Sequence, residues 1–157
     1  FLAIDFYNAA RAFFDSSKYG EAIDTFTAAR GLFRKLKDIP SVSRADRYLA
    51  ECHIKMNQPE LALVHASKAL DVATIRHDAE IECKASLALA KANMALGNLE
   101  KVSGPLCTAD YIASSSNDWN LILEIQEEYR LLAVQENRFK DADEIAGRIA
   151  TIREILE

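Results

Sequence analysis

Apolar residues recur at helical spacing through most of this 157-residue chain. Between residues 22 and 36 they follow i, i+3 and i+4 steps, while Asp24 and Arg30 fall on the opposite side. This spacing is typical of an amphipathic helix. The pattern recurs in eight segments and predicts helices over residues 2–17, 19–36, 41–57, 59–76, 79–97, 99–115, 118–136 and 139–156.

Short polar clusters separate these segments, and only five glycines and three prolines occur in the whole chain. Such a composition favours helices joined by short turns. Asp38, Asp78 and Asp118 fall where helices are expected to begin, and their carboxylates can accept hydrogen bonds from free backbone N–H groups. Pro40 and Pro59 fall in first turns, where proline is tolerated.

A period of forty residues runs through the sequence. It relates Ala10, Ala50 and Ala90, the three aspartates just named, and Ala22, Ala62, Val102 and Ala142. A fixed internal period predicts a stacked repeat array. We therefore expect a single array over residues 1–157, an all-α superhelix of four helix-turn-helix repeats with eight antiparallel helices. The repeats are expected at about 3–42, 43–82, 83–122 and 123–157.

The small residues of this period allow neighbouring helices to approach closely, and larger side chains are expected to fill the spaces between them. The expected fillers are Phe13, Tyr19, Phe26 and Phe139. Trp119, the only tryptophan, opens a helix after a serine-rich turn. It is either a packing residue between repeats or a partly exposed anchor.

The order of residues in the first repeat resembles the tetratricopeptide (TPR) consensus. That order is Phe6, Ala9, Ala10, Phe13, Tyr19, Ala22, Phe26 and Ala29. The forty-residue period and Leu96-Gly97-Asn98 resemble the long-repeat subgroup, which includes Leu-Gly-Asn repeat adaptors, rapsyn and regulators of the maltose-activator type. The chain departs from the consensus at Asp46, His53 and Arg130.

The resemblance implies that the first helix of each repeat lines a concave groove. Carried over to this chain, the candidate partner-binding residues are Tyr7, Arg11, Phe14, Arg44, Arg47, Glu51, Lys55, Lys84 and Lys91. Most of them are basic, although the chain carries a net charge of −5. Glu124 and Glu127 would make the far end of the groove negative.

Basic side chains at helical spacing can form charge-assisted hydrogen bonds with peptide carboxylates. We therefore expect the groove to hold an acidic peptide, extended or helical. The alternative is a solvated face whose charges pair with each other, such as Arg47 with Glu51 at i, i+4. The residues at the places of the chaperone-docking carboxylate clamp do not match that clamp.

Three classes of function remain open. The first is a protein–protein interaction scaffold, and the second is a peptide- or ligand-sensing segment of a larger signalling or transcription protein. The third is a structural subunit that acts through its convex face or its ends. The isoleucines of residues 139–156 predict a homo-oligomer through the C-terminal end, because native arrays normally carry a polar cap there.

No catalytic pattern is visible in the sequence. His53, His65 and His77 are twelve residues apart, and neither HExxH nor CxxC occurs. We expect no enzyme activity, metal site or cofactor. The odd set of Cys52, Cys83 and Cys107 suits reduced thiols in an intracellular, cytoplasmic protein.

Two further expectations concern partners and context. The net charge argues against direct nucleic-acid binding, and no apolar run is long enough to cross a membrane. The chain begins at Phe1, inside an apolar periodic stretch, so we expect it to be a piece of a longer protein.

Overall fold

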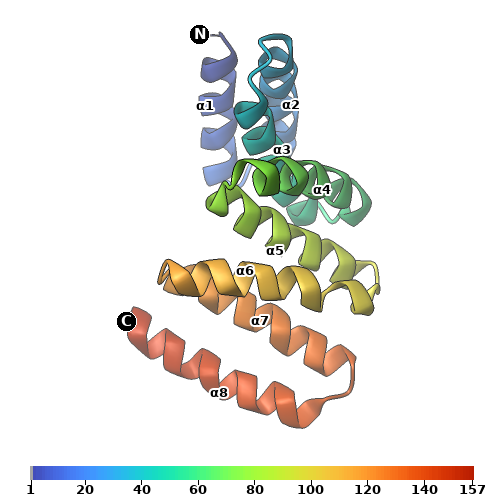
Figure 1. Cartoon of the computed structure of the whole chain (residues 1–157), viewed down its shortest axis with the longest axis vertical. Helices are drawn as coiled ribbons and strands as arrows, with labels where there is room; N and C mark the ends of the chain where they lie inside the picture. The colour runs from blue at the N-terminus through green and yellow to red at the C-terminus, as the bar shows by residue number, and fades with distance from the viewer. Residues whose placement is uncertain (1) are drawn as a thin grey trace.

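Helical hairpins make up the whole fold in a computed structural model that describes residues 2–157. Successive helices pack against each other, and the four hairpins stack along the long axis of the molecule (Figure 1). This confirms the expected all-α arrangement of eight helices; residues 2–157 contain no strand. The helices are α1 (Leu2–Asp15), α2 (Tyr19–Lys35), α3 (Ile39–Lys55), α4 (Pro59–Arg76), α5 (Ala79–Ala95), α6 (Ser103–Ser115), α7 (Trp119–Gln135) and α8 (Phe139–Leu156).

One predicted helix differs from its expected form. The segment 99–115 begins with a 3₁₀ turn, η1 (Leu99–Lys101), and the α-helix starts only at Ser103. Pro105 explains this, because it has no N–H to donate to the carbonyl of Lys101 and its ring would collide with that group. The backbone before Pro105 therefore winds into a tighter turn.

The three aspartate caps are confirmed. A carboxylate oxygen of Asp38 accepts a hydrogen bond from the N–H of Ser41 at 3.2 Å. Asp78 and Asp118 accept from Ile81 and Leu121 at 3.2 Å and 3.1 Å. Each bond satisfies one of the free N–H groups at a helix start. The cap at Asp38 also places the start of α3 at Ile39, two residues earlier than expected.

The seven turns between helices share one backbone conformation. A residue with positive φ occurs every twenty residues, at Ser17, Lys37, Asn57, His77, Gly97, Asn117 and Asn137. In each turn the next N–H reaches back five residues, as in the 2.9 Å bond from Lys18 to the carbonyl of Phe13. This is the Schellman ending of a helix. Its repetition gives every hairpin the same turn.

The alanines of the forty-residue period lie at helix contacts and are buried, as expected. Phe26 is also fully buried, but the prediction that Phe139 fills the core is wrong, because Phe139 is 59% exposed. Tyr19 holds the same register in the first repeat and packs edge-on against Phe14 at 5.7 Å. In the fourth repeat Val134 stands at the register of Phe14, so Phe139 lacks an aromatic partner.

Candidate functional site

A hollow of about 220 Å³ lies where α1, α3, α5 and α7 converge, and no second helix of a hairpin contributes to it. The first helices therefore share one face, as the resemblance implies. We call this hollow the central groove. Its lining includes Phe14, Asp15, Arg47, Tyr48, Glu51, Lys55, Lys84, Lys91 and Glu124.

The structure brings six of the nine candidate residues together in the central groove: Phe14, Arg47, Glu51, Lys55, Lys84 and Lys91. Tyr7 and Arg44 lie instead beside a second hollow of about 290 Å³ near the start of the array. Arg11 is exposed on α1. Tyr48 also lines the central groove, and the sequence reasoning missed it.

Arg47 is held rigidly at the floor of the central groove. Only 7% of the residue is exposed, and its guanidinium carbon lies 4.0 Å from the centre of the Tyr48 ring. Tyr48 in turn stacks on Phe26 at 4.9 Å and meets Phe14 edge-on at 5.3 Å. The aromatic core of the first two repeats thus fixes the position of this cation.

The Nε of Arg47 is buried and has no hydrogen-bond partner within residues 2–157. Glu51 comes closest, with its Oε1 at 3.7 Å from this Nε, which is longer than a hydrogen bond. Burial opposes the charge of the guanidinium, but attraction to Glu51 and Tyr48 outweighs it, and the pKa of Arg47 is raised. The side chain is therefore a charged donor that is not fully satisfied.

Glu51 is the acidic neighbour of Arg47 on the same helix. Burial raises the pKa of Glu51, although the nearby Arg47 and Lys84 act to lower it. The loss of hydration therefore outweighs the attraction of two cations. Glu51 therefore forms only a long ion pair with Arg47, at 3.7 Å, and burial disfavours its ionised form.

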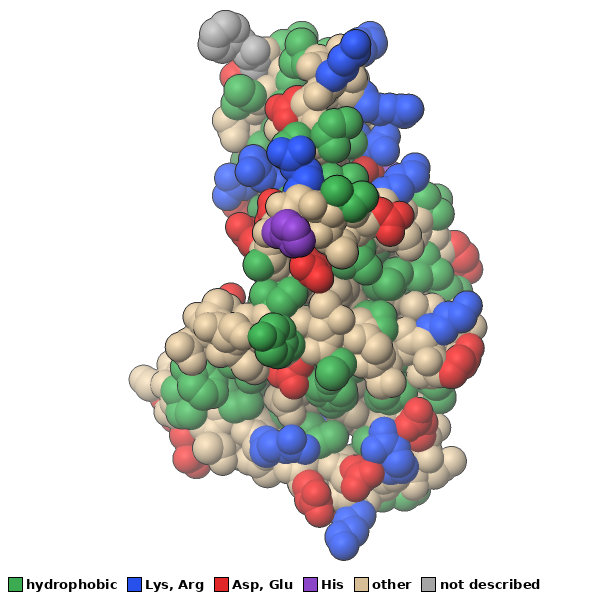
Figure 2. Space-filling model, in the orientation of Figure 1, with side chains coloured by type: hydrophobic (Ala, Val, Ile, Leu, Met, Phe, Trp, Pro, Cys, Tyr) green, Lys and Arg blue, Asp and Glu red, His purple; other side chains and the backbone are tan. Residues whose placement is uncertain are grey.

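The charges of the central groove are more mixed than the sequence suggested. Lys91 donates a hydrogen bond to Glu124 of α7 at 2.6 Å, so the acidic far end neutralises this lysine. The uncompensated basic character lies nearer the start of the array. On the face that Figure 2 shows, many Lys and Arg side chains lie over the first hairpins with some Asp and Glu among them, and both kinds mix over the last hairpin.

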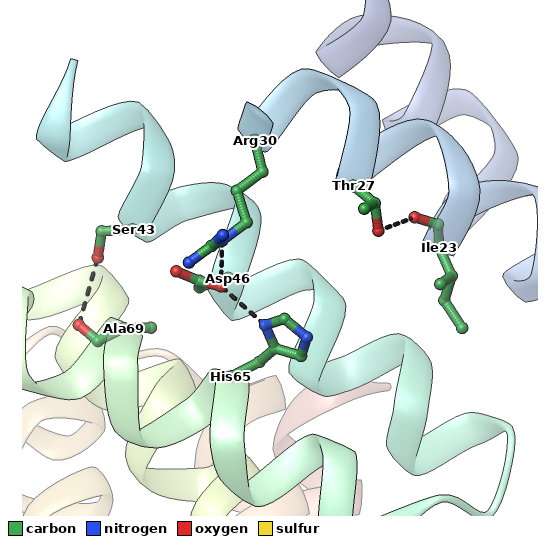
Figure 3. Close-up of polar contacts among 7 residues, drawn as sticks. All are labelled: Ile23, Thr27, Arg30, Ser43, Asp46, His65 and Ala69. Atoms are coloured by element: carbon green, nitrogen blue, oxygen red, sulfur yellow. Dashed lines mark hydrogen bonds and ion pairs between the residues drawn. The ribbon is translucent and has the colours of Figure 1, made fainter. Parts of the chain in front are cut away.

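Asp46, a departure from the consensus, forms a buried clasp between three helices. Its Oδ1 accepts from the Nε of Arg30 on α2 at 2.7 Å and lies 2.7 Å from the Nδ1 of His65 on α4 (Figure 3). Only 3% of the Asp46 side chain is exposed. The polar residue at an apolar position was the sequence signal for this cluster.

His53 and His65 also meet, which their twelve-residue spacing did not suggest. Their rings stack with centres 5.4 Å apart and planes at 4°. They lie on α3 and α4, so the hairpin brings them together although one helix could not. The Nδ1 of His53 lies 2.8 Å from the Oε1 of Gln58.

The three cysteines are free thiols, and two of them are buried. Burial raises the pKa of Cys52 to about 12 and that of Cys83 to about 11. Thiols with such pKa values contain little nucleophilic thiolate at neutral pH. Across residues 2–157, no three His, Cys, Asp or Glu side chains are close enough together to hold a metal ion.

No protein-family model matches the chain, and no curated protein matches it in sequence. The likeness to tetratricopeptide arrays therefore depends on this chain's own residue pattern. Among the described residues, no helix combines the length and the apolar character needed to cross a membrane.

Proposed function

We propose that the chain is a non-catalytic interaction module, similar to tetratricopeptide arrays, that holds an acidic peptide segment of a partner protein in the central groove. The observation that carries this proposal is Arg47. It is a buried cation that aromatic rings hold in place, and its Nε lacks a hydrogen-bond partner within residues 2–157. A carboxylate from a partner could pair with this guanidinium more closely than Glu51 does.

Two lysines extend the same chemistry. Lys55 and Lys84 line the groove beside Arg47 and take part in no ion pair within residues 2–157. The peptide is expected to place one carboxylate at Arg47 and others near these lysines. Lys91, which is bonded to Glu124, contributes less than the sequence suggested.

The test starts from an array of short acidic peptides and their amide counterparts, with Glu replaced by Gln. The best acidic peptide is then labelled with fluorescein, and its affinity is measured by fluorescence anisotropy. Arg47→Met keeps much of the side-chain volume and removes the charge. We expect it to weaken binding roughly tenfold or more, because the ligand carboxylate loses a desolvated partner.

The matched control is Arg34→Met, since Arg34 is exposed on α2, away from the groove. It should leave the affinity unchanged. Glu51→Gln should strengthen binding, because it removes the carboxylate that pairs with Arg47 at 3.7 Å. If no acidic peptide binds, or if Arg47→Met and Arg34→Met behave alike, the proposal is wrong.

A further inference from the structure

The two ends of the array expose apolar side chains on the faces that, inside the array, pack against a neighbouring hairpin. Helices α1 and α2 form one end of the stack, and α7 and α8 form the other (Figure 1). Ile4 and Phe6 of α1 are 53% and 36% exposed. At the opposite end, Leu131 is 45% exposed and lines a hollow of about 450 Å³ with Ala146 and Ile149. We call these surfaces the α1 end, which includes Ile4, Asp5 and Phe6, and the α7–α8 end, which includes Leu131, Ala150 and Arg153.

The forty-residue period relates these two ends to each other. The positive-φ turns recur every twenty residues, so equivalent residues occupy equivalent places in every hairpin. A contact between two successive hairpins can therefore be advanced along the array in steps of one repeat. One step beyond the third junction, which joins the third and fourth hairpins, the first partner lies at the α7–α8 end. The second partner then has the register of the α1 end of a second copy.

One pair of places is charged inside the array and apolar at its ends. At the third junction, Lys91 of α5 donates a hydrogen bond to Glu124 of α7 at 2.6 Å. One repeat further along, Leu131 has the register of Lys91, and Ile4 has the register of Glu124. Both of these apolar side chains are about half exposed. A contact between Leu131 of one copy and Ile4 of the next would remove both from water.

The places of the ionic clasp change in the same way. At the first junction, the Nε of Arg30 donates to the Oδ1 of Asp46 at 2.7 Å. Ala150 has the register of Arg30, and Phe6 has the register of Asp46. Inside the array, the residues at the register of Phe6 are all polar and buried: Asp46, Ser86 and Gln126. At the ends, an exposed alanine and a partly exposed phenylalanine replace the ionic pair, and an alanine leaves room for a ring.

A third pair of places is apolar inside the array and charged at its ends, with opposite signs. Ala73 of α4 and Ala85 of α5 belong to one buried cluster at the middle junction. Apolar residues also stand at these places in the other two junctions. At the ends the same places hold Arg153 and Asp5. Arg153 already donates to Glu127 of its own chain at 3.0 Å, and its guanidinium has further N–H groups for a second carboxylate.

We propose that the α7–α8 end of one copy of this chain docks on the α1 end of a second copy, in the arrangement of one more hairpin junction. A second copy fits better than an unrelated partner because the two ends change together. Two pairs of places become apolar on both sides, and a third acquires opposite charges. Such a contact leaves one free end on each side, so further copies add in a line. The proposal does not depend on the acidic-peptide groove.

The test is sedimentation velocity on two variants, each alone and then mixed. Ile4→Glu changes only the α1 end and Leu131→Glu only the α7–α8 end, and circular dichroism should show native helicity for both. The native chain should form dimers and then longer species as its concentration rises. Each variant alone should associate roughly tenfold or more weakly, because a carboxylate would be buried against an apolar side chain. Their equimolar mixture should form a 1:1 dimer that grows no further, since it joins the one intact α7–α8 end to the one intact α1 end.

Three outcomes would overturn the proposal. If Ile4→Glu alone still dimerises, the contact is a symmetric one between two α7–α8 ends. If the mixture stays monomeric, or if the native chain is monomeric at every concentration, a second copy does not cover the α1 end. The matched control is Ile75→Glu, which places the same charge at an isoleucine of α4 that is 79% exposed, and it should associate like the native chain.

A further variant tests the charged pair. Asp5→Lys places a cation where Arg153 of the next copy would lie, so it should weaken self-association, and less so at high salt. Asp24→Lys makes the same charge change at an exposed aspartate of α2 and should have little effect. Equal association of the two lysine variants would overturn the proposed arrangement.

Discussion

Arg47 and Glu51 belong to one helix turn, and burial disfavours the charged form of both, yet only in Arg47 do the neighbouring groups outweigh it. The guanidinium stays charged because it lies on the Tyr48 ring and near a carboxylate. For the Glu51 carboxylate, the loss of hydration outweighs the attraction to Arg47, Lys84 and Lys91, so its pKa is raised. At the residue scale, Arg47 therefore keeps its charge, whereas burial disfavours the ionised form of Glu51.

Glu51→Gln should make the fold more stable at neutral pH. The pKa of Glu51 is higher in the folded protein than in the unfolded chain. The free energy of unfolding therefore falls as pH rises from the ordinary glutamate pKa through this raised value, and it stays lower above it. The glutamine variant avoids that loss. Thermal unfolding at several pH values should show a higher Tm for the variant at neutral pH and no difference in acid.

The exposed Glu60→Gln is the control for this measurement, since it should change the Tm little at any pH. A lower Tm of Glu51→Gln at neutral pH would mean that the attraction between Glu51 and Arg47 outweighs the cost of burial.

Asp46→Ala should destabilise the protein by about 1–3 kcal/mol, because it leaves Arg30 and His65 without their common acceptor. Asp46→Asn keeps an acceptor oxygen and should cost less. Urea unfolding followed by circular dichroism measures both. If the alanine variant is as stable as the native protein, the clasp contributes nothing to the junction between the first two hairpins.

At the scale of the element, the seven turns use one backbone conformation with different residues. Gly97 and the asparagines at 57, 117 and 137 adopt positive φ easily, but Ser17, Lys37 and His77 do so at a cost. No neighbouring atom would touch a Cβ at Gly97, so only the backbone conformation favours glycine there. The turns therefore differ in strain although their geometry is the same.

Lys37→Gly should stabilise the fold by about 0.5–1 kcal/mol, because it relieves a positive φ of 58°. Gly97→Ala should destabilise it by about 1–2 kcal/mol for the converse reason. Chemical denaturation gives both values. Asn57→Gly is the control and should have little effect; a destabilising Lys37→Gly would show that the lysine side chain makes a compensating contact.

The elements were predictable where local chemistry determines them. Asp38, Asp78 and Asp118 mark helix starts, because a helix cap needs only a short side-chain acceptor beside free N–H groups. The 3₁₀ turn before α6 was not predicted, because proline is tolerated near a helix start and Pro105 therefore gave no sign of a break. For the groove, the resemblance predicted that Arg47 and Lys84 share one face, and both line the central groove. The burial of Arg47 was not predictable, since it depends on Tyr48 stacking on Phe26 of another helix.

At the scale of the whole molecule, the two halves of the array are built differently. Aromatic rings and a buried ionic clasp hold the first two hairpins, whereas the core of the later hairpins consists largely of Ala, Leu and Ile. The proposed acidic-peptide groove uses the rigid aromatic part. The third junction lies in the aliphatic part, where Asp110 and Ile145 stand at the places of Arg30 and His65.

The fourth hairpin also changes the outer end of the array. Arg11, Glu51 and Lys91 share one register with Leu131, so a position that is charged in three repeats is apolar in the fourth. Leu131 is 45% exposed and lines a shallow hollow with Ile149. Ile145, Ile149 and Ile152 themselves are buried, so the apolar surface at this end is smaller than the sequence suggested.

We expect this remaining surface to support weak, concentration-dependent dimerisation. Sedimentation velocity should show the sedimentation coefficient of the native chain rising with concentration. Leu131→Glu places a charge where the first three repeats have one, and should keep the chain monomeric. Leu36→Glu introduces the same charge at a leucine of the first hairpin that is 67% exposed, and should still dimerise. A native chain that remains monomeric at every concentration contradicts the expectation. Only Leu131 lies at the α7–α8 end, so loss of the dimer in both variants would show that added negative charge prevents dimerisation wherever it is placed.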